Sequence, residues 1–214
     1  MVDRVLGVVL AGGLARRMGD GGHRALPDKG RLDLGGQSLM AEVIARLAGQ
    51  CDRLVLNANG NAARFADLGL TVVPDSIAGF PGPLAGVLAG MDHAAGLGFT
   101  HVLSAAADTP FLPEDLAARL KEASALQSRP IALAATRENG RLVRHPTFGL
   151  WPVDLRADLR AALDDGVSKV VVWTDRHGTA LAEFPATPVD PFFNVNTPED
   201  LERARAIWQN RHRA

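Results

Sequence analysis

Short apolar runs alternate with longer segments of helical periodicity through most of this 214-residue chain. Residues 5–10, 53–57, 71–74, 101–105 and 131–135 are short and rich in Val, Leu, Ile and Ala, which predicts strands. Apolar residues at helical spacing lie between them: Leu39, Met40, Val43, Ile44 and Leu47; Leu84, Val87, Leu88 and Met91; Leu116 and Leu120. This alternation predicts a three-layer α/β fold, Rossmann-like, with a mostly parallel central sheet.

Polar or glycine residues follow each of the first four predicted strands. Gly12 and Gly13 follow the first strand, Asn57 ends the second, Asp75 follows the third and Asp108 follows the fourth. In open parallel sheets, ligands bind beyond the carboxyl ends of the strands. Since ordinary turn chemistry explains one such position better than four, the pattern favours a single cleft at this edge.

The second half of the chain has a different character. Residues 140–152, 165–180 and 185–198 mix cations, prolines and aromatic residues, and residues 170–173 predict a further strand. We expect this half to add a lobe over the same edge of the sheet. The sequence has no internal repeat or flexible linker, so residues 1–214 are expected to form one domain.

Composition excludes several classes of protein. A formal net charge of −1 gives no broad basic surface, so neither nucleic acid nor a membrane is expected as a partner. No apolar run approaches the roughly 18 residues of a membrane span. The single cysteine, Cys51, excludes an internal disulfide framework and agrees with a cytoplasmic location. We expect Cys51 to be a small buried hydrophobic residue.

The first strand ends in a glycine turn that cations follow. Gly12 and Gly13 lack a Cβ, so the backbone there can approach a ligand closely. Arg16, Arg17 and Lys29 supply the positive charge that a phosphate chain needs. The spacing matches neither a Walker loop nor the dinucleotide-binding glycine motif. A glycine pair after a strand is also a common tight turn, but the three cations favour a site for a nucleoside triphosphate.

Carboxylates at the strand ends are candidate ligands. Asp108 ends an apolar run beside the predicted phosphate loop, where a Mg²⁺ ligand is expected, although an aspartate before a turn is also common. Asp75 would bind the nucleotide or cap a turn. Gly79 and Gly82 precede a helix that Pro83 begins, and this loop either contacts an anion or sugar or has no ligand.

Near the C-terminus, Thr197 and Pro198 predict a helix start, with Thr197 as the cap. Two asparagines, Asn194 and Asn196, alternate just before it and would share one side of an extended segment. His145 is read as a hydrogen-bonded structural histidine. Histidines at metal spacing and a nucleophile elbow are both missing from the sequence, so zinc and covalent catalysis are not expected.

Several of these segments together resemble a known family. Leu10-Ala11-Gly12-Gly13 with Arg17-Met18-Gly19, followed by Asp28-Lys29-Gly30, is similar to the signature of nucleotidyltransferases that transfer NMP from an NTP. Three later segments resemble the molybdenum cofactor guanylyltransferases: Asp75-Ser76 with Gly82-Pro83-Leu84-Ala85-Gly86, then Asp108-Thr109-Pro110, then Asn194-Val195-Asn196-Thr197-Pro198. The resemblance extends from residue 5 to about residue 205.

The resemblance implies a role for each matching residue. Leu10, Ala11 and Gly12 would contact GTP through the backbone, with Gly13 beside them and Gly82 in a second loop. The remaining implied roles are Lys29 and Arg17 at the phosphates, Asn57 and Asp75 at the nucleotide, Asp108 on Mg²⁺, and Asn194 and Asn196 on the molybdopterin side. The loop at 20–27 is longer than this family leads us to expect, which bears on the placement of Lys29.

The resemblance also implies the reaction. The terminal phosphate of molybdopterin would attack the α-phosphorus of GTP and release pyrophosphate, with Arg17, Lys29 and Asp108 as the catalytic groups and Mg²⁺ as cofactor. Molybdenum insertion proteins and molybdoenzyme chaperones would be further partners. The alternatives are a molybdopterin cytidylyltransferase, a sugar-phosphate nucleotidyltransferase, or a GTP-binding or molybdopterin-carrier module without turnover.

Overall fold

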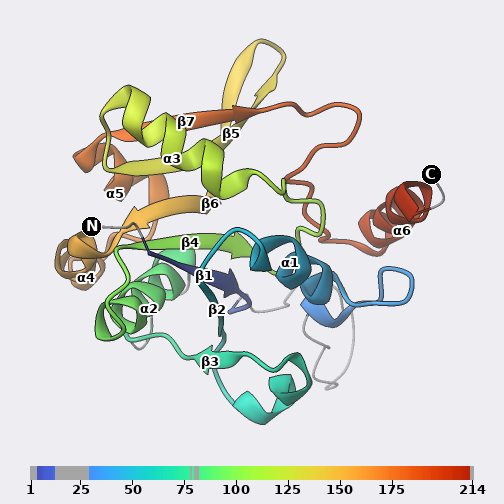
Figure 1. The fold of residues 1–214 in the computed structure, drawn as a ribbon, viewed down its shortest axis with the longest axis horizontal. Coiled ribbons are helices and arrows are strands. Elements are labelled where there is room, and N and C mark those ends of the chain that lie inside the picture. The colour runs from blue at the N-terminus through green and yellow to red at the C-terminus, as the bar shows by residue number, and fades with distance from the viewer. Residues whose placement is uncertain (1–3, 13–28, 78, 80–81, 213–214) are drawn as a thin grey trace.

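The computed structural model describes residues 4–12, 29–77, 79 and 82–212, and these form one seven-stranded sheet between helices (Figure 1). The strand order is β3-β2-β1-β4-β6-β5-β7. The strands are β1 (Val5–Leu10), β2 (Arg53–Asn57), β3 (Thr71–Val73), β4 (His101–Ala106), β5 (Ile131–Glu138), β6 (Arg141–Pro152) and β7 (Thr179–Phe184). The predicted first five strands therefore exist. The bounds of the first four agree with the prediction within one residue, whereas β5 continues to Glu138, three residues beyond the predicted end.

Most neighbouring strands in the sheet are parallel, as predicted. β1 pairs in parallel with β2 and β4, β2 with β3, and β5 with β7. Only β6 runs against its neighbours β4 and β5 within this sheet. The prediction of a lobe over the edge of the sheet is wrong for residues 140–152, because β6 lies inside the sheet and its buried Leu150 and Trp151 pair with Leu103 and Val102.

Helices cover both faces of the sheet and complete the predicted three layers (Figure 1). α1 (Leu39–Ala48) and α3 (Leu116–Gln127) pack on one face, and α2 (Pro83–Gly96) and α4 (Arg156–Asp164) pack on the other. β1 shows why both faces are filled: Val5 and Val9 belong to the first core, whereas Leu6 and Val8 belong to the second. This is the two-residue alternation of a strand buried on both sides.

Local signals set the helix ends. Ser38 caps α1, since its Oγ accepts a hydrogen bond from the Ala41 N–H at 3.1 Å. The last helix, α6 (Pro198–His212), docks on the loop after β4 through a third apolar cluster. The cluster contains Leu34, Leu39, Phe111, Val195, Leu201 and Ala204. Short 3-10 helices complete the described elements: η1 (Lys29–Arg31), η2 (Ala62–Leu68) and η3 (Val153–Leu155).

The predicted strand at 170–173 is wrong, because these residues begin a helix, α5 (Val170–His177). Val170, Trp173 and Thr174 are buried, which is the i, i+3, i+4 spacing of a helix face, whereas Val172 is 46% exposed. The Trp173 ring stacks on Trp151 with centroids 6.1 Å apart. Packing of one helix face on the sheet therefore outweighs the strand preference of three consecutive valines.

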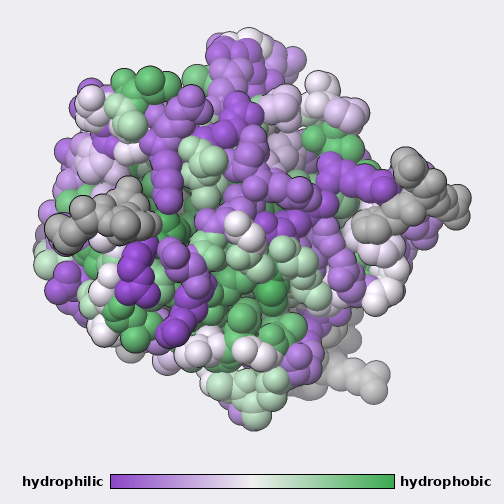
Figure 2. Space-filling model, viewed as in Figure 1, coloured by the Kyte–Doolittle hydropathy of each residue, from purple (hydrophilic) through white to green (hydrophobic). Residues whose placement is uncertain are grey.

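The surface is mostly hydrophilic in the view of Figure 2, with apolar residues gathered between α1 and η2. Partly buried apolar residues of α1, β2 and the segment from η2 to β3 pack on the first core, among them Ile44, Leu54, Leu68 and Leu70. Within the described residues, no helix is both long and apolar enough to cross a membrane.

Candidate functional site

The carboxyl ends of the first four strands meet at one edge of the sheet, as the sequence predicted. Beyond β1, the Ala11 N–H donates to the Asn57 carbonyl at 2.9 Å, and the Ala107 N–H donates to the Leu10 carbonyl at 3.0 Å. The backbone that follows β1 is therefore held between the ends of β2 and β4. Leu10, Ala11 and Gly12 lie at the centre of this edge, whereas Gly13 and Arg17 lie outside the described residues.

Two asparagines orient the Asp75 carboxylate. Asn57 Nδ2 donates to Asp75 Oδ1 at 2.9 Å and to the Val73 carbonyl at 3.1 Å. Asn59 Nδ2 donates to Asp75 Oδ2 at 2.7 Å, and Asn59 Oδ1 accepts the Asp75 N–H at 2.9 Å. Asn59 was not among the predicted site residues. Its signal was the alternation Asn57-Ala58-Asn59 after β2, which places both amides on one side.

Glycines let α2 approach the strand ends. A Cβ on Gly86 would lie 2.3 Å from Asn57 Oδ1 and 2.8 Å from Leu10 Cδ2, so only glycine fits there without a shift. Gly12 also lies near Asn57, but a Cβ on Gly12 would be 3.6 Å from Asn57 Oδ1, which is an ordinary van der Waals contact. Gly82 is the residue before α2, with φ at +152°, and has no side chain to cap the first backbone N–H groups of the helix. Such N–H groups at a helix start can bind an anion.

The loops after β1 and β4 meet the segment before α6. Lys29 Nζ donates to Asn196 Oδ1 at 2.8 Å, although 167 positions separate the two residues. The Val195 N–H donates to the Asp108 carbonyl at 3.0 Å, and Thr109 Oγ1 donates to Asn194 Oδ1. Val195 is buried while both asparagines are exposed, in agreement with their predicted common side.

Asp108 lies in a half-buried position next to positive charge. Burial raises the pKa of its carboxyl group, because desolvation penalises the charged form, and the positive charge of Lys29 acts in the opposite direction. Lys29 and Asp108 therefore share one electrostatic environment. A cation that binds here would be attracted by the Asp108 carboxylate. It would stabilise the charged form of this carboxylate, which burial has partly removed from water.

The donor set around Asp108 can accommodate one kind of metal site. Within the described residues, no three His, Cys, Asp or Glu side chains are grouped as a complete metal centre. Mg²⁺ commonly takes one or two carboxylates and completes its shell with phosphate oxygens and water. A single carboxylate beside a lysine thus fits a metal that arrives with a polyphosphate and does not fit a preformed zinc site.

His145 has the structural partners expected of it. Its Nε2 lies 2.8 Å from Thr136 Oγ1, and its ring stacks on Phe192 at 4.4 Å between centroids. Burial lowers the pKa of His145, and the negative charges of Asp190 and Glu138 act in the opposite direction. His145 is thus favoured in its neutral form inside a packed cluster.

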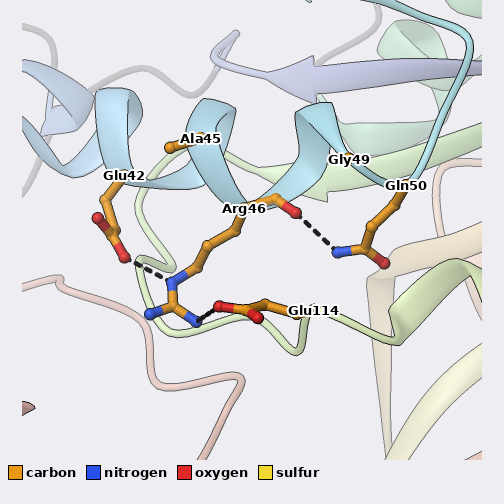
Figure 3. Close-up of a pocket in the computed structure, with 6 residues that line it drawn as sticks. All are labelled: Glu42, Ala45, Arg46, Gly49, Gln50 and Glu114. Carbon is orange, nitrogen blue, oxygen red and sulfur yellow. Dashed lines mark hydrogen bonds and ion pairs between the residues drawn. The ribbon is translucent and has the colours of Figure 1, made fainter.

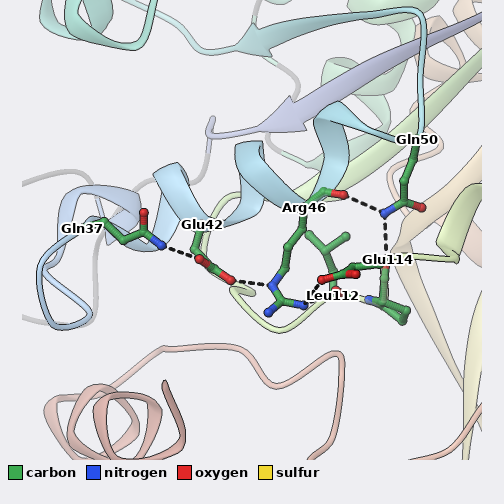
Figure 4. Close-up of polar contacts among 7 residues, drawn as sticks. Gln37, Glu42, Arg46, Gln50, Leu112 and Glu114 are labelled. Atoms are coloured by element: carbon green, nitrogen blue, oxygen red, sulfur yellow. Dashed lines mark hydrogen bonds and ion pairs between the residues drawn. The ribbon is translucent and has the colours of Figure 1, made fainter. Parts of the chain in front are cut away.

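A separate pocket of about 450 Å³ lies along α1 and contains none of the predicted site residues (Figure 3). Its lining residues are Glu42, Ala45, Arg46, Gly49, Gln50 and Glu114. Arg46 bonds to Glu42 at 2.5 Å and pairs with Glu114 at 3.7 Å, and Gln50 Nε2 donates to the Arg46 and Pro113 carbonyls (Figure 4). These contacts join α1 to the loop before α3, so the pocket is a structural junction.

The chain is similar to known proteins along nearly its whole length. Residues 7–179 match the family described as the MobA-like NTP transferase domain. The chain is 53% identical over 207 residues to a molybdenum cofactor guanylyltransferase of Rhodopseudomonas palustris, which covers 94% of this chain and 92% of the relative. A protein of the same description from Bradyrhizobium sp. is 51% identical over 206 residues, with 95% and 92% covered.

Solved structures share the fold. The molybdopterin-guanine dinucleotide biosynthesis protein A of Archaeoglobus fulgidus superposes with a TM-score of 0.71 at 21% identity, covering 96% of this chain and 99% of that one. A CMP:2-keto-3-deoxy-manno-octonic acid synthetase in complex with CTP superposes with a TM-score of 0.70 at 12% identity, covering 98% and 99%. Both likenesses concern the Rossmann-like fold of nucleotidyltransferases.

Proposed function

The chain belongs to the MobA-like NTP transferase family, and we propose that it transfers GMP from GTP to the terminal phosphate of molybdopterin, releasing pyrophosphate. Relatives more than 50% identical along almost the whole chain are described as molybdenum cofactor guanylyltransferases. The observation that carries the proposal is the meeting of Lys29, Asp108 and Asn196 at the carboxyl edge of the sheet. That edge is where an α/β sheet binds its ligands.

The nucleotide side of the proposed site consists of the first three strand ends. The backbone of Leu10, Ala11 and Gly12 would contact GTP, since the glycine leaves room for close approach. Asn57 and Asp75 would bind the nucleoside, because their side chains are already held by hydrogen bonds before a ligand arrives. Gly82 would contribute at the start of α2.

The phosphate side depends on charge. Two anions must meet, so positioning and neutralisation of the charge that builds on the leaving group are the main tasks of the protein. Lys29 would pair with the triphosphate, and Arg17 is proposed beside it from the sequence match alone. Asp108 would hold the divalent metal, proposed to be Mg²⁺, which supplies positive charge to the phosphates when bound.

The acceptor side is proposed for Asn194 and Asn196. A phosphate nucleophile is already ionised near neutral pH, so no strong general base is needed, and none of the described residues is assigned that role. Asn196 contacts Lys29, so it lies where an acceptor phosphate would approach the triphosphate. We further propose a cytoplasmic location, because the single cysteine, Cys51, is a free thiol, and free thiols are typical of a reducing compartment.

The decisive experiment is incubation with molybdopterin, GTP and Mg²⁺, followed by mass analysis of the pterin product. We expect a pterin product that is heavier by one GMP unit. One pyrophosphate should be released for each molecule of this product. A panel of CTP, UTP and ATP tests the cytidylyl and sugar-phosphate alternatives, and preference for another nucleotide would refute the proposal. GTP binding without pyrophosphate release would indicate a binding or carrier module.

Asp108→Ala tests the proposed metal ligand. We expect it to keep the fold and to lose at least about 100-fold in turnover, the usual scale for removal of one preorganised electrostatic group. Asp115→Ala is the matched control, because Asp115 lies in the same loop region, makes no side-chain capping hydrogen bond and, among the described residues, forms a long ion pair of 3.9 Å with Arg119. Near-normal turnover of Asp108→Ala in saturating Mg²⁺ would remove Asp108 from the mechanism.

A further inference from the structure

Asp200 holds the backbone of the segment that carries Asn196. Its Oδ2 accepts the N–H of Asn196 and the N–H of Thr197, both at 3.0 Å. In return, Thr197 Oγ1 accepts the Asp200 N–H at 3.1 Å. Burial raises the pKa of Asp200, but hydrogen bonds from Asn196 and Thr197 outweigh it, and the pKa is lowered overall. The carboxylate is therefore charged and its hydrogen bonds are charge-assisted.

Helix capping explains only part of this arrangement. In a capping box, the side chain of the cap residue accepts a hydrogen bond from the backbone N–H of the third helical residue. The side chain of that third residue accepts a hydrogen bond from the backbone N–H of the cap. Thr197 and Asp200 fulfil both conditions, with Thr197 as the cap of α6. The additional bond to the Asn196 N–H lies outside that motif. It fixes the residue before the cap, which a helix end does not require.

Asn196 in turn holds the catalytic lysine. Its Oδ1 accepts the Lys29 ammonium at 2.8 Å. On the other side of Asn196, the Val195 N–H is bonded to the Asp108 carbonyl at 3.0 Å. The asparagine is therefore fixed by a bond at its own N–H and by another at the preceding residue.

We propose that Asp200 is a positioning residue for the transfer reaction: through Asn196 it holds the Lys29 ammonium at the phosphate end of the site. This inference rests on the proposed function. A lysine side chain has four rotatable bonds, and fixing it costs rotamer entropy. An ammonium that is already held near its working position loses less of this entropy when the triphosphate binds. Asp200 has no direct contact with substrate in this account.

The test compares Asp200→Ala with Thr197→Ala. Both substitutions remove one half of the capping box, so both are expected to weaken α6 to a similar extent in urea unfolding. Thr197→Ala keeps the Asn196 N–H and its Asp200 acceptor, whereas Asp200→Ala removes that acceptor. We expect Asp200→Ala to raise KM and Kd for GTP about tenfold, and Thr197→Ala to change them less than twofold.

Asp200→Glu provides a second test of the proposal if Asp200→Ala is too unstable to fold. Glutamate is a usual capping-box residue at this position and can still bond to the Thr197 N–H, but its carboxylate is displaced by one methylene from the Asn196 N–H. We expect wild-type stability with a several-fold rise in KM for GTP. Wild-type KM and Kd in Asp200→Glu, or equal losses in Asp200→Ala and Thr197→Ala, would overturn the proposal.

A second comparison tests the route through the lysine. In a Lys29→Ala background, Asp200→Ala is expected to weaken GTP binding no further, and a full additional tenfold loss would overturn the route. GTP binding measured by calorimetry needs no pterin. If the wild type binds GTP but forms no pterin product, the proposed function fails while the comparison of Asp200 with Thr197 remains readable in Kd.

Discussion

Alanine at Gly86 should displace the asparagine that orients Asp75. The new Cβ would lie 2.3 Å from Asn57 Oδ1 and 2.8 Å from Leu10 Cδ2, distances that real Cβ atoms do not occupy, so Asn57 must move. Its amide then releases Asp75 Oδ1 and the Val73 carbonyl, which it bonds at 2.9 and 3.1 Å. The substitution thus acts on the packing of α2 and on the proposed nucleotide site together.

The expected magnitude combines three effects. Overpacking of a well-filled position costs about 2 kcal/mol, within a usual range of roughly 1–3. Two lost hydrogen bonds cost about 1 kcal/mol each. Alanine recovers about 1 kcal/mol of helix propensity relative to glycine. The free energy of unfolding should therefore fall by about 3 kcal/mol, and GTP affinity should fall at least about tenfold because Asp75 loses an orienting partner.

Two glycines of the same helix provide matched controls. At Gly90 a Cβ would meet Val8 Cγ2 at 2.6 Å, so alanine there strains the packing on β1 but touches no predicted site residue. We expect a loss of about 1 kcal/mol and unchanged GTP affinity. At Gly96 no atom lies within 4 Å of the added Cβ, and alanine should stabilise the helix by up to about 1 kcal/mol.

Urea unfolding and GTP calorimetry on the three variants give the comparison. We expect weakened GTP binding for Gly86→Ala alone. Equal GTP affinity in Gly86→Ala and Gly90→Ala, measured where both are folded, would refute the role of Asn57 in orienting the nucleotide site. A stabilised Gly86→Ala protein would refute the packing argument itself.

Three further predictions concern the core, the thiol and the histidine. Ser104 is buried in β4, accepts from Trp151 Nε1 and donates to the Thr147 carbonyl, each at 2.8 Å, so Ser104→Ala should lower the free energy of unfolding by about 1–3 kcal/mol in urea titrations. Burial raises the pKa of the Cys51 thiol to about 11, so iodoacetamide at pH 8 should alkylate the native protein far more slowly than the urea-unfolded chain, and equal rates would contradict this. The pKa of His145 is lowered in the fold, so the unfolded chain binds that proton more tightly, and stability should fall as pH drops through the unfolded value near 6.5. His145→Gln should remove that part of the pH dependence, and an identical pH slope in urea midpoints would contradict the assignment.

Strong local patterns made the first half of the fold predictable. Strands β1, β2 and β4 are buried along most of their length, so their sequences are mostly apolar and their bounds follow from the sequence. The second half was harder to predict for identifiable reasons. The hairpin between β5 and β6 turns at Asn139-Gly140, with φ of +47° and +79° and the pair Glu138 and Arg141 opposite each other. That dipeptide is a strong hairpin signal that the prediction of a lobe overlooked.

The α5 helix shows a different limit. Consecutive valines favour a strand by propensity, but α5 is decided by which of its side chains find partners on the rest of the fold. Trp173 does so twice, through its stacking on Trp151 and through its Nε1–H, which donates to Asp158 at 2.7 Å. Neither partner can be located from the sequence around residue 173.

The site divides in the same way between local and long-range information. Asn57, Asp75 and Asp108 could be placed because each lies at the end of a strand or shortly after it, and the order β3-β2-β1-β4 then brings them to one edge. The contact of Lys29 with Asn196 depends on where α6 docks, which Phe111, Val195 and Leu201 determine by packing in the third apolar cluster. Since those residues look like ordinary core positions, the sequence identified both polar partners but not their pairing. A lysine after the first strand is therefore held by an asparagine that lies just before a helix near the other end of the chain.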